Sequence, residues 1–337
     1  MARVAILILN YNGVDHLRRF LPSIILYSDK YDIIVGDNGS TDNSIKVLQD
    51  EFKEVEIIKL KNNFGYAEGY NQLIGQIDHE YIALVNSDIE ATPGWAKALI
   101  NTLDSDPDVA AVQPKILSYT DRNKFEYAGA AGGFIDKYGY PYCRGRIFNT
   151  LEEDLGQYDD PLEVFWASGA CFMIRREAFI NAGEFDGDFF AHMEEIDLCW
   201  RFQKLGYKVL FNPKSTVYHL GGGTLDYQNP RKTYLNYRNN WSMLVKNLTE
   251  KKRKLITRWF MDILSIFLYL LKFQFGNVMA VIKAHYYILA NRKHLHNKKK
   301  SFKERHENLK DVQLNNASIV WEYFVKRKKK FSELVPH

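Results

Sequence analysis

The sequence predicts an α/β fold built on a doubly wound parallel sheet, and two observations carry that prediction. Apolar runs of strand length occur at 4–9, 33–35 and 81–85, and they are continuous rather than alternating, which is typical of strands buried on both faces. Stretches with helical spacing at 15–27 and 42–52 separate them. Strands that alternate with helices form parallel sheets, whose ligands bind beyond the carboxyl ends of the strands.

A polar cluster follows each of these apolar runs. Asn10-Tyr11-Asn12 follows the first, Asp37-Asn38-Gly39-Ser40 the second and Asn86-Ser87-Asp88 the third. An aspartate at the end of a buried strand needs a partner that offsets its desolvation, and carboxylate oxygens suit Mg²⁺ or Mn²⁺ beside a diphosphate. The pattern therefore predicts a nucleotide and metal site at this edge, with a turn or a helix cap as the structural alternative for each aspartate.

Composition and charge divide the chain into two parts. The 337 residues are 46% hydrophobic, enough for a sizeable core. Residues 1–229 contain 21 Lys and Arg against 34 Asp and Glu, whereas residues 230–337 contain 24 against 7. We expect a catalytic domain at 1–229 and a basic, aromatic extension at 230–337. The acidic first part argues against nucleic acid as a ligand, and three scattered cysteines without a secretion signal indicate the cytoplasm.

The elements after residue 117 have weaker patterns. The stretch 118–160 is rich in glycine and tyrosine and predicts loops or short hairpins over the site. A strand-like run at 164–174, interrupted at Ser168-Gly169, is followed by a short helix at 175–182. We further expect a helix at 195–205, closed by Gly206, and one more strand at 208–211.

Three carboxylates within four residues, Glu194, Glu195 and Asp197, form the most acidic segment near the predicted cleft. Like charges this close raise the pKa of at least one of them, which yields a base able to take a proton near neutral pH. The alternative is that they only open a helix and favour its dipole. His219 ends a strand-like segment and is a second candidate metal ligand, although a lone histidine is more often structural.

The extension contains helical patterns at 231–248, 255–271 and 278–290. The second is strongly apolar but is interrupted by Arg258 and Asp262 and is shorter than the about 20 apolar residues of a membrane span. We interpret the last two as amphipathic helices on the inner face of the membrane, with basic residues toward anionic lipid. A helical hairpin packed on the catalytic domain, or a homodimer contact, is the alternative.

Taken together, these residues resemble the family 2 glycosyltransferases over roughly residues 3–225. The resemblance implies the GT-A fold, a Rossmann-like nucleotide-diphospho-sugar transferase domain, here with a C-terminal helical extension. The segments that carry it are 8–13, 37–42, 63–67, 86–88, 166–170 and 194–201. By that resemblance the nucleotide sugar is bound by Leu9, Tyr11, Asp37, Asn63, Gly65, Asn86 and Ser87. The acceptor side is lined by Trp166 and Gly169.

The sequence departs from the family pattern at two positions. Asn86 replaces the first aspartate of the metal-binding DXD motif, so Mn²⁺ or Mg²⁺ would rest on Asp88 and His219. Glu195 stands in for the family's aspartate base, which leaves the choice between Glu194 and Glu195 open, with Asp197 in the same segment.

The resemblance implies an inverting transfer of a sugar from a nucleoside diphosphate sugar to a hydroxyl group. By analogy with the family, we expect dTDP-rhamnose or a UDP-sugar as the donor, and a polyprenyl-diphosphate-linked or polysaccharide chain at the cell envelope as the acceptor. A nucleotide-dependent oxidoreductase would need Gly-x-Gly-x-x-Gly after the first strand, where this chain has Asn10-Tyr11-Asn12-Gly13. A non-catalytic nucleotide-sugar or lipid-binding scaffold with the same fold is the second alternative.

Overall fold

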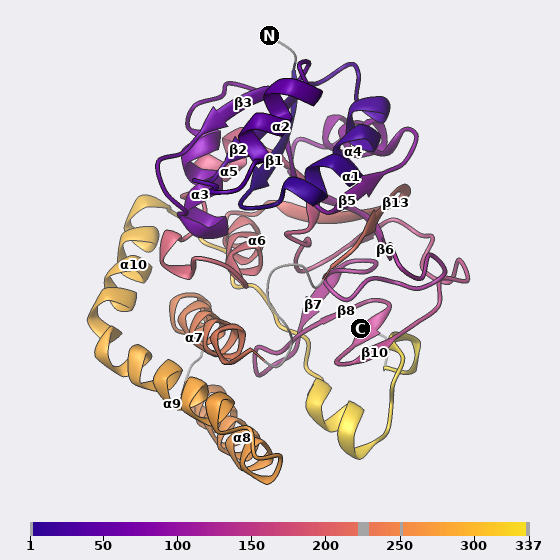
Figure 1. Ribbon diagram of the computed structural model, residues 1–337. Helices are drawn as coiled ribbons and strands as arrows, with labels where there is room; N and C mark the ends of the chain where they lie inside the picture. The colour runs from indigo at the N-terminus through magenta and orange to yellow at the C-terminus, as the bar shows by residue number, and fades with distance from the viewer. Residues whose placement is uncertain (1–2, 222–228, 250–251, 335–337) are drawn as a thin grey trace.

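The predicted α/β fold is confirmed in a computed structural model, which describes residues 3–221, 229–249 and 252–334 (Figure 1). Within these residues the main sheet has nine strands in the order β11-β13-β6-β12-β4-β1-β2-β3, with β5 paired to β13. Its strands are β1 (Val4–Asn10), β2 (Asp32–Asp37), β3 (Glu56–Lys59), β4 (Tyr81–Asn86), β5 (Ile89–Ala91), β6 (Val109–Ser118), β11 (Leu162–Glu163), β12 (Cys171–Arg175) and β13 (Lys208–His219).

Strands β1 to β4 are parallel, and β12 is inserted antiparallel between β4 and β6. Asn10 is in register with Asp37 on one side of β1, and Leu9 is in register with Asn86 on the other. The polar clusters predicted to share one edge of the sheet therefore do so.

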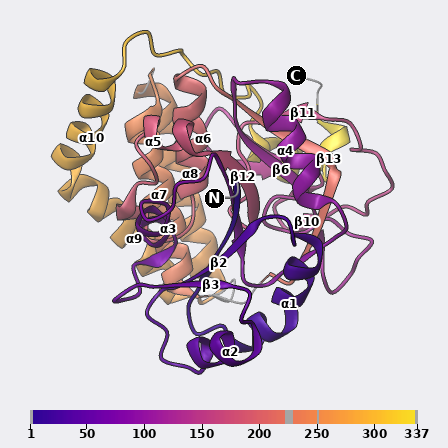
Figure 2. The ribbon, with the colours of Figure 1, turned by 90° about the horizontal axis from the view of Figure 1, so that it is seen from above.

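Helices cover both faces of the sheet, as Figure 2 shows. One face packs against α1 (Val14–Tyr27), α2 (Ser44–Glu51) and α4 (Trp95–Ser105), and the other against α3 (Gly65–Ile74), α5 (Arg176–Asn181) and α6 (Glu194–Lys204). Neighbouring residues of β1 alternate between the two cores: Ile6 faces the first group and Leu7 the second, and both are fully buried. Burial on both faces explains why the strand sequences are continuously apolar.

A smaller sheet lies beside the main one and forms from the glycine-rich stretch, as expected for short hairpins. Its strands are β7 (Gly133–Ile135), β8 (Pro141–Cys143), β9 (Arg146–Ile147) and β10 (Thr150–Leu151). Trp166 joins the two sheets, because its backbone pairs with Gly133 and its indole Nε1 donates to the Phe134 carbonyl. A Cβ on Gly133 would lie 2.0 Å from the Trp166 ring, so only glycine fits there.

Four helices follow the main sheet: α7 (Pro230–Asn247), α8 (Lys252–Leu271), α9 (Phe275–Ala290) and α10 (Arg292–Arg305). The sequence predicted the first three but missed α10, which buries only Leu295 and Phe302 and so lacks an apolar stripe. Met243 and Leu244 of α7 share a hydrophobic cluster with β1 and α6. A domain boundary near residue 230 stays a prediction, since this cluster crosses it.

Two strand predictions need correction. The strand expected over 164–174 begins only at Cys171, because residues 166–170 turn along the cleft instead of continuing the ladder. The strand expected over 208–211 continues to His219 as β13, past polar residues that interrupt its apolar pattern. In the described part of the chain, no helix combines the length and apolar content needed to cross a bilayer.

Candidate active site

The loops after β1 and β2 form one hydrogen-bonded unit. Asp37 is almost fully buried, and its two carboxylate oxygens accept from Asn10 Nδ2 at 3.3 Å and from the Ser40 amide at 3.0 Å. The Asn12 amide donates to Ser40 Oγ at 2.9 Å. Asp37 thus organises the loop. A nucleoside would contact a carboxylate that already accepts these two hydrogen bonds.

Tyr11 lies beside that loop and is 47% exposed. An aromatic ring that stays open at the end of a buried strand offers an apolar surface on which a base can stack. Leu9 is partly buried against Gly69 of α3 and helps to form the floor behind the loop. Tyr11 is therefore accessible to a nucleoside, whereas Asp37 is buried.

The loop before α3 is fastened to the same edge by Asn38. Its Nδ2 donates to the Gly65 carbonyl at 3.0 Å and to Asn63 Oδ1 at 3.2 Å, and its Oδ1 accepts from the Phe64 amide at 3.0 Å. Gly65 has φ +77°, and a Cβ there would lie 2.4 Å from the Phe190 carbonyl oxygen. The sequence named Asn63 and Gly65 but gave Asn38 no role; its position directly after Asp37 is the signal that was available.

Asp88 and His219, 131 residues apart, meet because β5 pairs with the end of β13. Asp88 Oδ1 and His219 Nε2 are 3.1 Å apart, and both side chains are buried. The other ring nitrogen of His219, Nδ1, lies 3.3 Å from Glu126 Oε2. Burial on its own lowers the pKa of His219, but the carboxylates of Glu126 and Asp88 outweigh it and raise that pKa to about 10. The sequence did not identify Glu126.

The Asp88–His219 pair fits a divalent metal whose remaining ligands come from the substrate. A neutral histidine nitrogen and a carboxylate oxygen suit Mn²⁺, so the ion would bind by displacing the proton that the raised pKa of His219 retains. A carboxylate next to the second histidine nitrogen is the usual arrangement around a metal-binding histidine. Among residues 3–221, 229–249 and 252–334, no three His, Cys, Asp or Glu groups are clustered in a way that would hold an ion by themselves. Ions of this class commonly take one or two protein ligands together with substrate phosphates.

Asn86 ends β4, and Ser87 follows it directly before Asp88, at the same edge of the sheet. The Asn86 amide donates to the Ala170 carbonyl at 2.9 Å, which places the end of β4 beside the 166–170 turn. Both side chains are partly exposed. A Cβ added at Gly13 would lie 3.5 Å from Ser87 Oγ, so the β1 and β4 loops approach closely.

Glu194 and Glu195 begin α6 and lie in different surroundings. Glu194 is 3% exposed, and burial, followed by the charge of Glu195, raises its pKa well above the ordinary value. Glu195 is partly exposed and lies against Gly169, where an added Cβ would be 3.7 Å from its carboxyl carbon. Burial raises the pKa of Glu195 to about 7, although backbone hydrogen bonds oppose the rise. The pKa of Glu195 therefore lies near neutral pH.

The remaining predicted site residues have structural partners. Asp197 is fully buried, and its carboxylate contacts Arg201 Nε at 3.0 Å, Asn247 Nδ2 at 2.7 Å and Lys246 Nζ at 3.1 Å. Trp166 is 3% exposed, between the two sheets. Gly169 is partly exposed, and its carbonyl accepts from Tyr66 Oη at 2.7 Å. Asp197 and Trp166 are therefore buried residues that support the site, whereas Gly169 lies at its surface.

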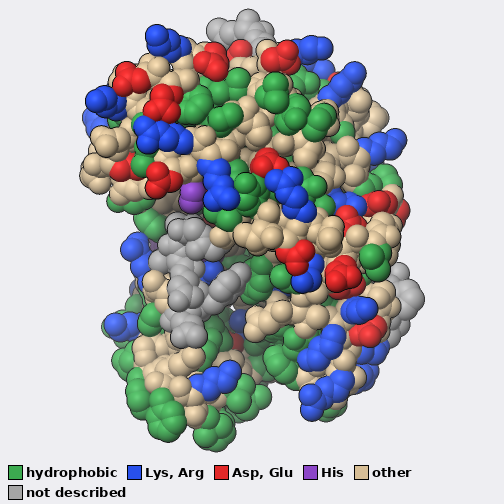
Figure 3. All heavy atoms as spheres, turned by 45° about the vertical axis from the view of Figure 1, so that its right-hand side comes forward, with side chains coloured by type: hydrophobic (Ala, Val, Ile, Leu, Met, Phe, Trp, Pro, Cys, Tyr) green, Lys and Arg blue, Asp and Glu red, His purple; other side chains and the backbone are tan. Residues whose placement is uncertain are grey.

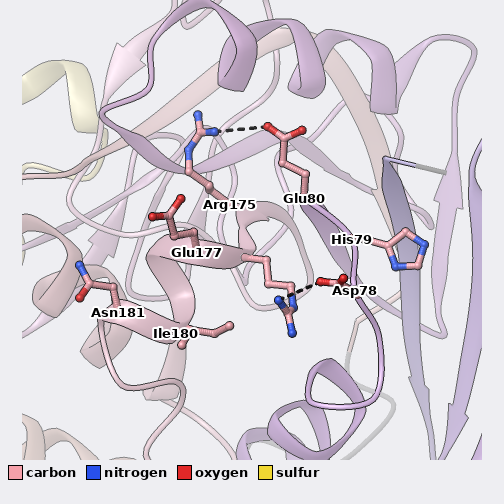
Figure 4. A pocket seen from close by; sticks show the side chains of 8 residues that line it. Asp78, His79, Glu80, Arg175, Glu177, Ile180 and Asn181 are labelled. Atoms are coloured by element: carbon pink, nitrogen blue, oxygen red, sulfur yellow. Dashed lines mark hydrogen bonds and ion pairs between the residues drawn. The ribbon is translucent and has the colours of Figure 1, made fainter. Parts of the chain in front are cut away.

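A cavity of about 600 Å³ lies at the opposite edge of the sheet (Figure 4). Four of its charged residues form two ion pairs: Arg176 with Asp78 at 3.2 Å and Arg175 with Glu80 at 3.8 Å. It lies at the start of β4 and the end of β12, and none of its lining residues belongs to the predicted site.

Solved structures with a similar fold include glycosyltransferases. A structure of GalNAc-T7 with UDP, GalNAc and Mn²⁺ has a TM-score of 0.56 at 17% identity, covering 73% of this chain and 48% of that one. The mannosyltransferase PcManGT from Pyrobaculum calidifontis, in complex with GDP-Man and Mn²⁺, has a TM-score of 0.52 at 13% identity, covering 90% and 81%. These similarities support the GT-A assignment of the fold.

Sequence relatives include two named enzymes. An N-acetylglucosaminyl-diphospho-decaprenol L-rhamnosyltransferase from Mycobacterium tuberculosis is 28% identical over 230 residues, which are 62% of this chain and 73% of the relative. A poly-beta-1,6-N-acetyl-D-glucosamine synthase from Staphylococcus aureus is 25% identical over 227 residues, covering 66% of this chain and 51% of the relative. The model of the family described as glycosyl transferase family 2 matches residues 5–183. The protein is a glycosyltransferase, and the chain belongs to glycosyl transferase family 2.

Proposed function

We propose that the protein is an inverting glycosyltransferase that transfers a sugar from dTDP-rhamnose or a UDP-sugar to a hydroxyl group of a polyprenyl-diphosphate-linked acceptor. The observation that carries this proposal is Glu195, a partly exposed residue whose carboxyl has a pKa of about 7 and lies against Gly169, with Oε2 buried and without a hydrogen-bond partner. A base with a pKa near the working pH is suited to remove a proton from an attacking hydroxyl.

In this proposal each acidic residue has a separate role. Glu195 removes the proton of the acceptor hydroxyl while that oxygen attacks the anomeric carbon from the face opposite the leaving diphosphate, and a single displacement inverts the centre. Glu194 stays protonated behind it. Asp88 and His219 would hold Mn²⁺ or Mg²⁺, which supplies neutralisation of the charge on the departing diphosphate. Tyr11 and the loop organised by Asp37 hold the nucleoside.

The relatives support this choice of donor and acceptor. The mycobacterial relative is named for rhamnose transfer to a decaprenyl-diphosphate-linked N-acetylglucosamine, and the staphylococcal one for the synthesis of a polysaccharide. We therefore place the protein in the assembly of a cell-envelope polysaccharide, on the cytoplasmic side of the membrane.

A transfer assay tests the proposed function. The purified full chain is incubated with Mn²⁺, a polyprenyl-diphosphate-linked N-acetylglucosamine in detergent, and dTDP-rhamnose or a UDP-sugar in turn. We expect one donor to release its nucleoside diphosphate only when acceptor is present, with the lipid product gaining the mass of one sugar. Donor binding without transfer from any of these sugars would favour the non-catalytic scaffold.

The surface of α8 supports membrane contact. In most helices of a globular protein the apolar face is buried and the charged face is exposed, whereas α8 exposes its apolar face. Its charged pair faces inward: Arg258 Nε is 3.0 Å from Asp262 Oδ1, and Asp262 also accepts from Trp241 Nε1 at 2.6 Å. Arg258 and Asp262 therefore do not interrupt the apolar face, as the sequence suggested, but lie behind it. The outward face is apolar at helical spacing and continues onto α9, through Ile256, Trp259, Phe260, Ile263, Leu264, Phe267, Leu268, Leu271, Met279, Ile282, Tyr286 and Leu289.

Hydrophobic side chains gather over this end of the molecule in Figure 3. A second exposed aromatic group, Trp321 and Phe324, is followed by the basic stretch 326–330. Basic residues also flank the apolar face of α8, among them Arg253 and Lys272. An apolar, aromatic surface bordered by Lys and Arg matches the boundary of an anionic lipid leaflet, and we propose that lipid rather than a second copy of the chain covers it.

Vesicle sedimentation of the full chain tests this contact. Phe260→Glu combined with Leu264→Glu is expected to weaken binding to anionic vesicles at least about a hundredfold, since each buried side chain of this size contributes roughly 1.5–3 kcal/mol. Leu26→Glu, a change at an equally exposed leucine of α1, is the matched control and is expected to bind like the wild type. Unchanged sedimentation of the double variant, or its conversion of a dimer to a monomer, would contradict the lipid proposal.

A further inference from the structure

The segment that leads into the acidic pair has a costly backbone conformation. Phe190, His192 and Met193 have φ values of 62°, 72° and 72°, which side chains other than glycine rarely adopt. Such residues persist only where the surrounding structure fixes them, and they cluster at functional sites. Met193 directly precedes Glu194, so the direction in which α6 starts, and with it the position of Glu195, depends on what holds this segment.

One buried side chain of α7, that of Asn239, contacts three backbone carbonyls of this segment. Asn239 is fully buried, and its Nδ2 lies 2.9 Å from the Phe189 carbonyl oxygen, 2.9 Å from that of Ala191 and 2.7 Å from that of His192. Its Oδ1 accepts from Arg238 Nε at 2.8 Å, which fixes the orientation of the amide. Burying an amide is costly unless it is fully hydrogen-bonded, and here each of its polar atoms has a partner.

The same helix holds α6 on the other side of the acidic pair. Lys246 and Asn247 lie two turns after Asn239 and contact Asp197 Oδ1 at 3.1 and 2.7 Å. Residues seven or eight apart share one face of a helix. One face of α7 therefore contacts the chain both before and after Glu194-Glu195.

Polar contacts also join the front of the segment to the donor side. The Phe190 carbonyl accepts from the Tyr66 amide at 2.5 Å, at the start of α3. Asp186 pairs with Lys246 at 2.5 Å and with Lys298 of α10 at 2.5 Å. The helices of the extension thus reach the segment that carries the proposed base, whereas the match to the family model ends at residue 183.

We infer that Asn239 is a positioning residue for Glu195, acting through the backbone carbonyls of residues 189–192; this rests on the proposed function of Glu195. Removing the amide takes a donor from three carbonyls, of which only that of Phe189 keeps a second side-chain donor among the described contacts, Arg238 Nη2 at 2.8 Å, and it releases a strained backbone. A displacement of about 1 Å in a reacting group can lower the rate by about a hundredfold. The loop organised by Asp37, whose hydrogen bonds run to Asn10 and Ser40, lies outside this segment and keeps its geometry.

The experiment compares Asn239→Ala with Asn240→Ala in the full chain. Asn240 is the matched control, because it is a buried asparagine on the same helix whose Nδ2 donates at 2.7 Å to Gly139, away from the acidic pair. We expect Asn239→Ala to lower kcat about a hundredfold, to shift the pH midpoint of kcat, and to leave the Kd for nucleoside diphosphates unchanged. Asn240→Ala is expected to change none of the three.

Hydrogen exchange of the backbone amides tests the contact independently of turnover. Faster exchange across residues 187–193 is expected in Asn239→Ala and not in Asn240→Ala. If neither variant nor the wild type transfers sugar, the proposed function fails while the exchange result still decides whether Asn239 holds the segment. Equal kcat values and equal exchange in the two variants would overturn the inference, and Asn239→Ser, which keeps one donor, gives the same comparison if the alanine variant does not fold.

Discussion

Glu195→Gln is expected to lower kcat by about 10²–10⁴-fold, the usual contribution of a general base, with little change in donor affinity. Glutamine has the size of glutamate but cannot accept the hydroxyl proton at neutral pH. In the proposed mechanism the wild-type rate depends on the ionised fraction of Glu195, whose pKa burial raises to about 7. Turnover should therefore fall about tenfold per pH unit below that value and level off above it, and the variant should lose this dependence.

Glu194→Gln is the matched control for that result. Burial and the neighbouring Glu195 raise the pKa of its carboxyl, which favours the protonated form, so we expect an uncharged side chain to change little. Initial rates measured across the neutral range for the wild type and the two variants decide the assignment. Loss of turnover in Glu194→Gln with activity retained in Glu195→Gln would reverse the roles of the two residues.

The framework of the site could be predicted from the sequence because its signals are local. Continuous apolar runs indicated strands buried on both faces, and the polar residues that end them had to meet at one edge once the sheet was parallel. Asn10 is in register with Asp37 there, and Leu9 with Asn86. The acidic segment at 194–197 opens a helix, as expected.

What the sequence could not show depends on long-range packing. Glu126 approaches His219 only because the chain after β6 returns beside β13. Nothing local distinguishes Glu194 from Glu195; the difference arises from the position of Gly169 against one of them and the core against the other. Asn239 is one of several polar residues on α7, and its role follows from the segment that happens to pack against it.

The second large effect is expected at Asp88. Asp88→Asn replaces a charged oxygen ligand with a neutral amide beside His219, 3.1 Å away in the wild type. Because changes even to groups behind a metal ligand lower metal affinity about 10–100-fold, we expect the loss at the ligand itself to be at least that large. Nucleoside diphosphate binding that depends on Mn²⁺ should disappear, while metal-independent contacts of the nucleoside persist.

Asp32→Asn is the matched control, since Asp32 forms a similar pair with His79, at 2.8 Å, at the opposite end of β2 from the metal pair. This variant changes the same chemical group, in a comparable contact with histidine, at a place where we propose no ligand. It should retain metal-dependent binding.

Calorimetric titration of dTDP, UDP and GDP, each with and without Mn²⁺, into the wild type, Asp88→Asn and Asp32→Asn tests the central claim most directly. A nucleotide site completed by a metal on Asp88 and His219 predicts that one nucleotide binds much more tightly with Mn²⁺, that Asp88→Asn removes this difference, and that Asp32→Asn preserves it. Equal binding with and without Mn²⁺ in the wild type, or an Asp88→Asn variant that retains the metal dependence, would contradict it.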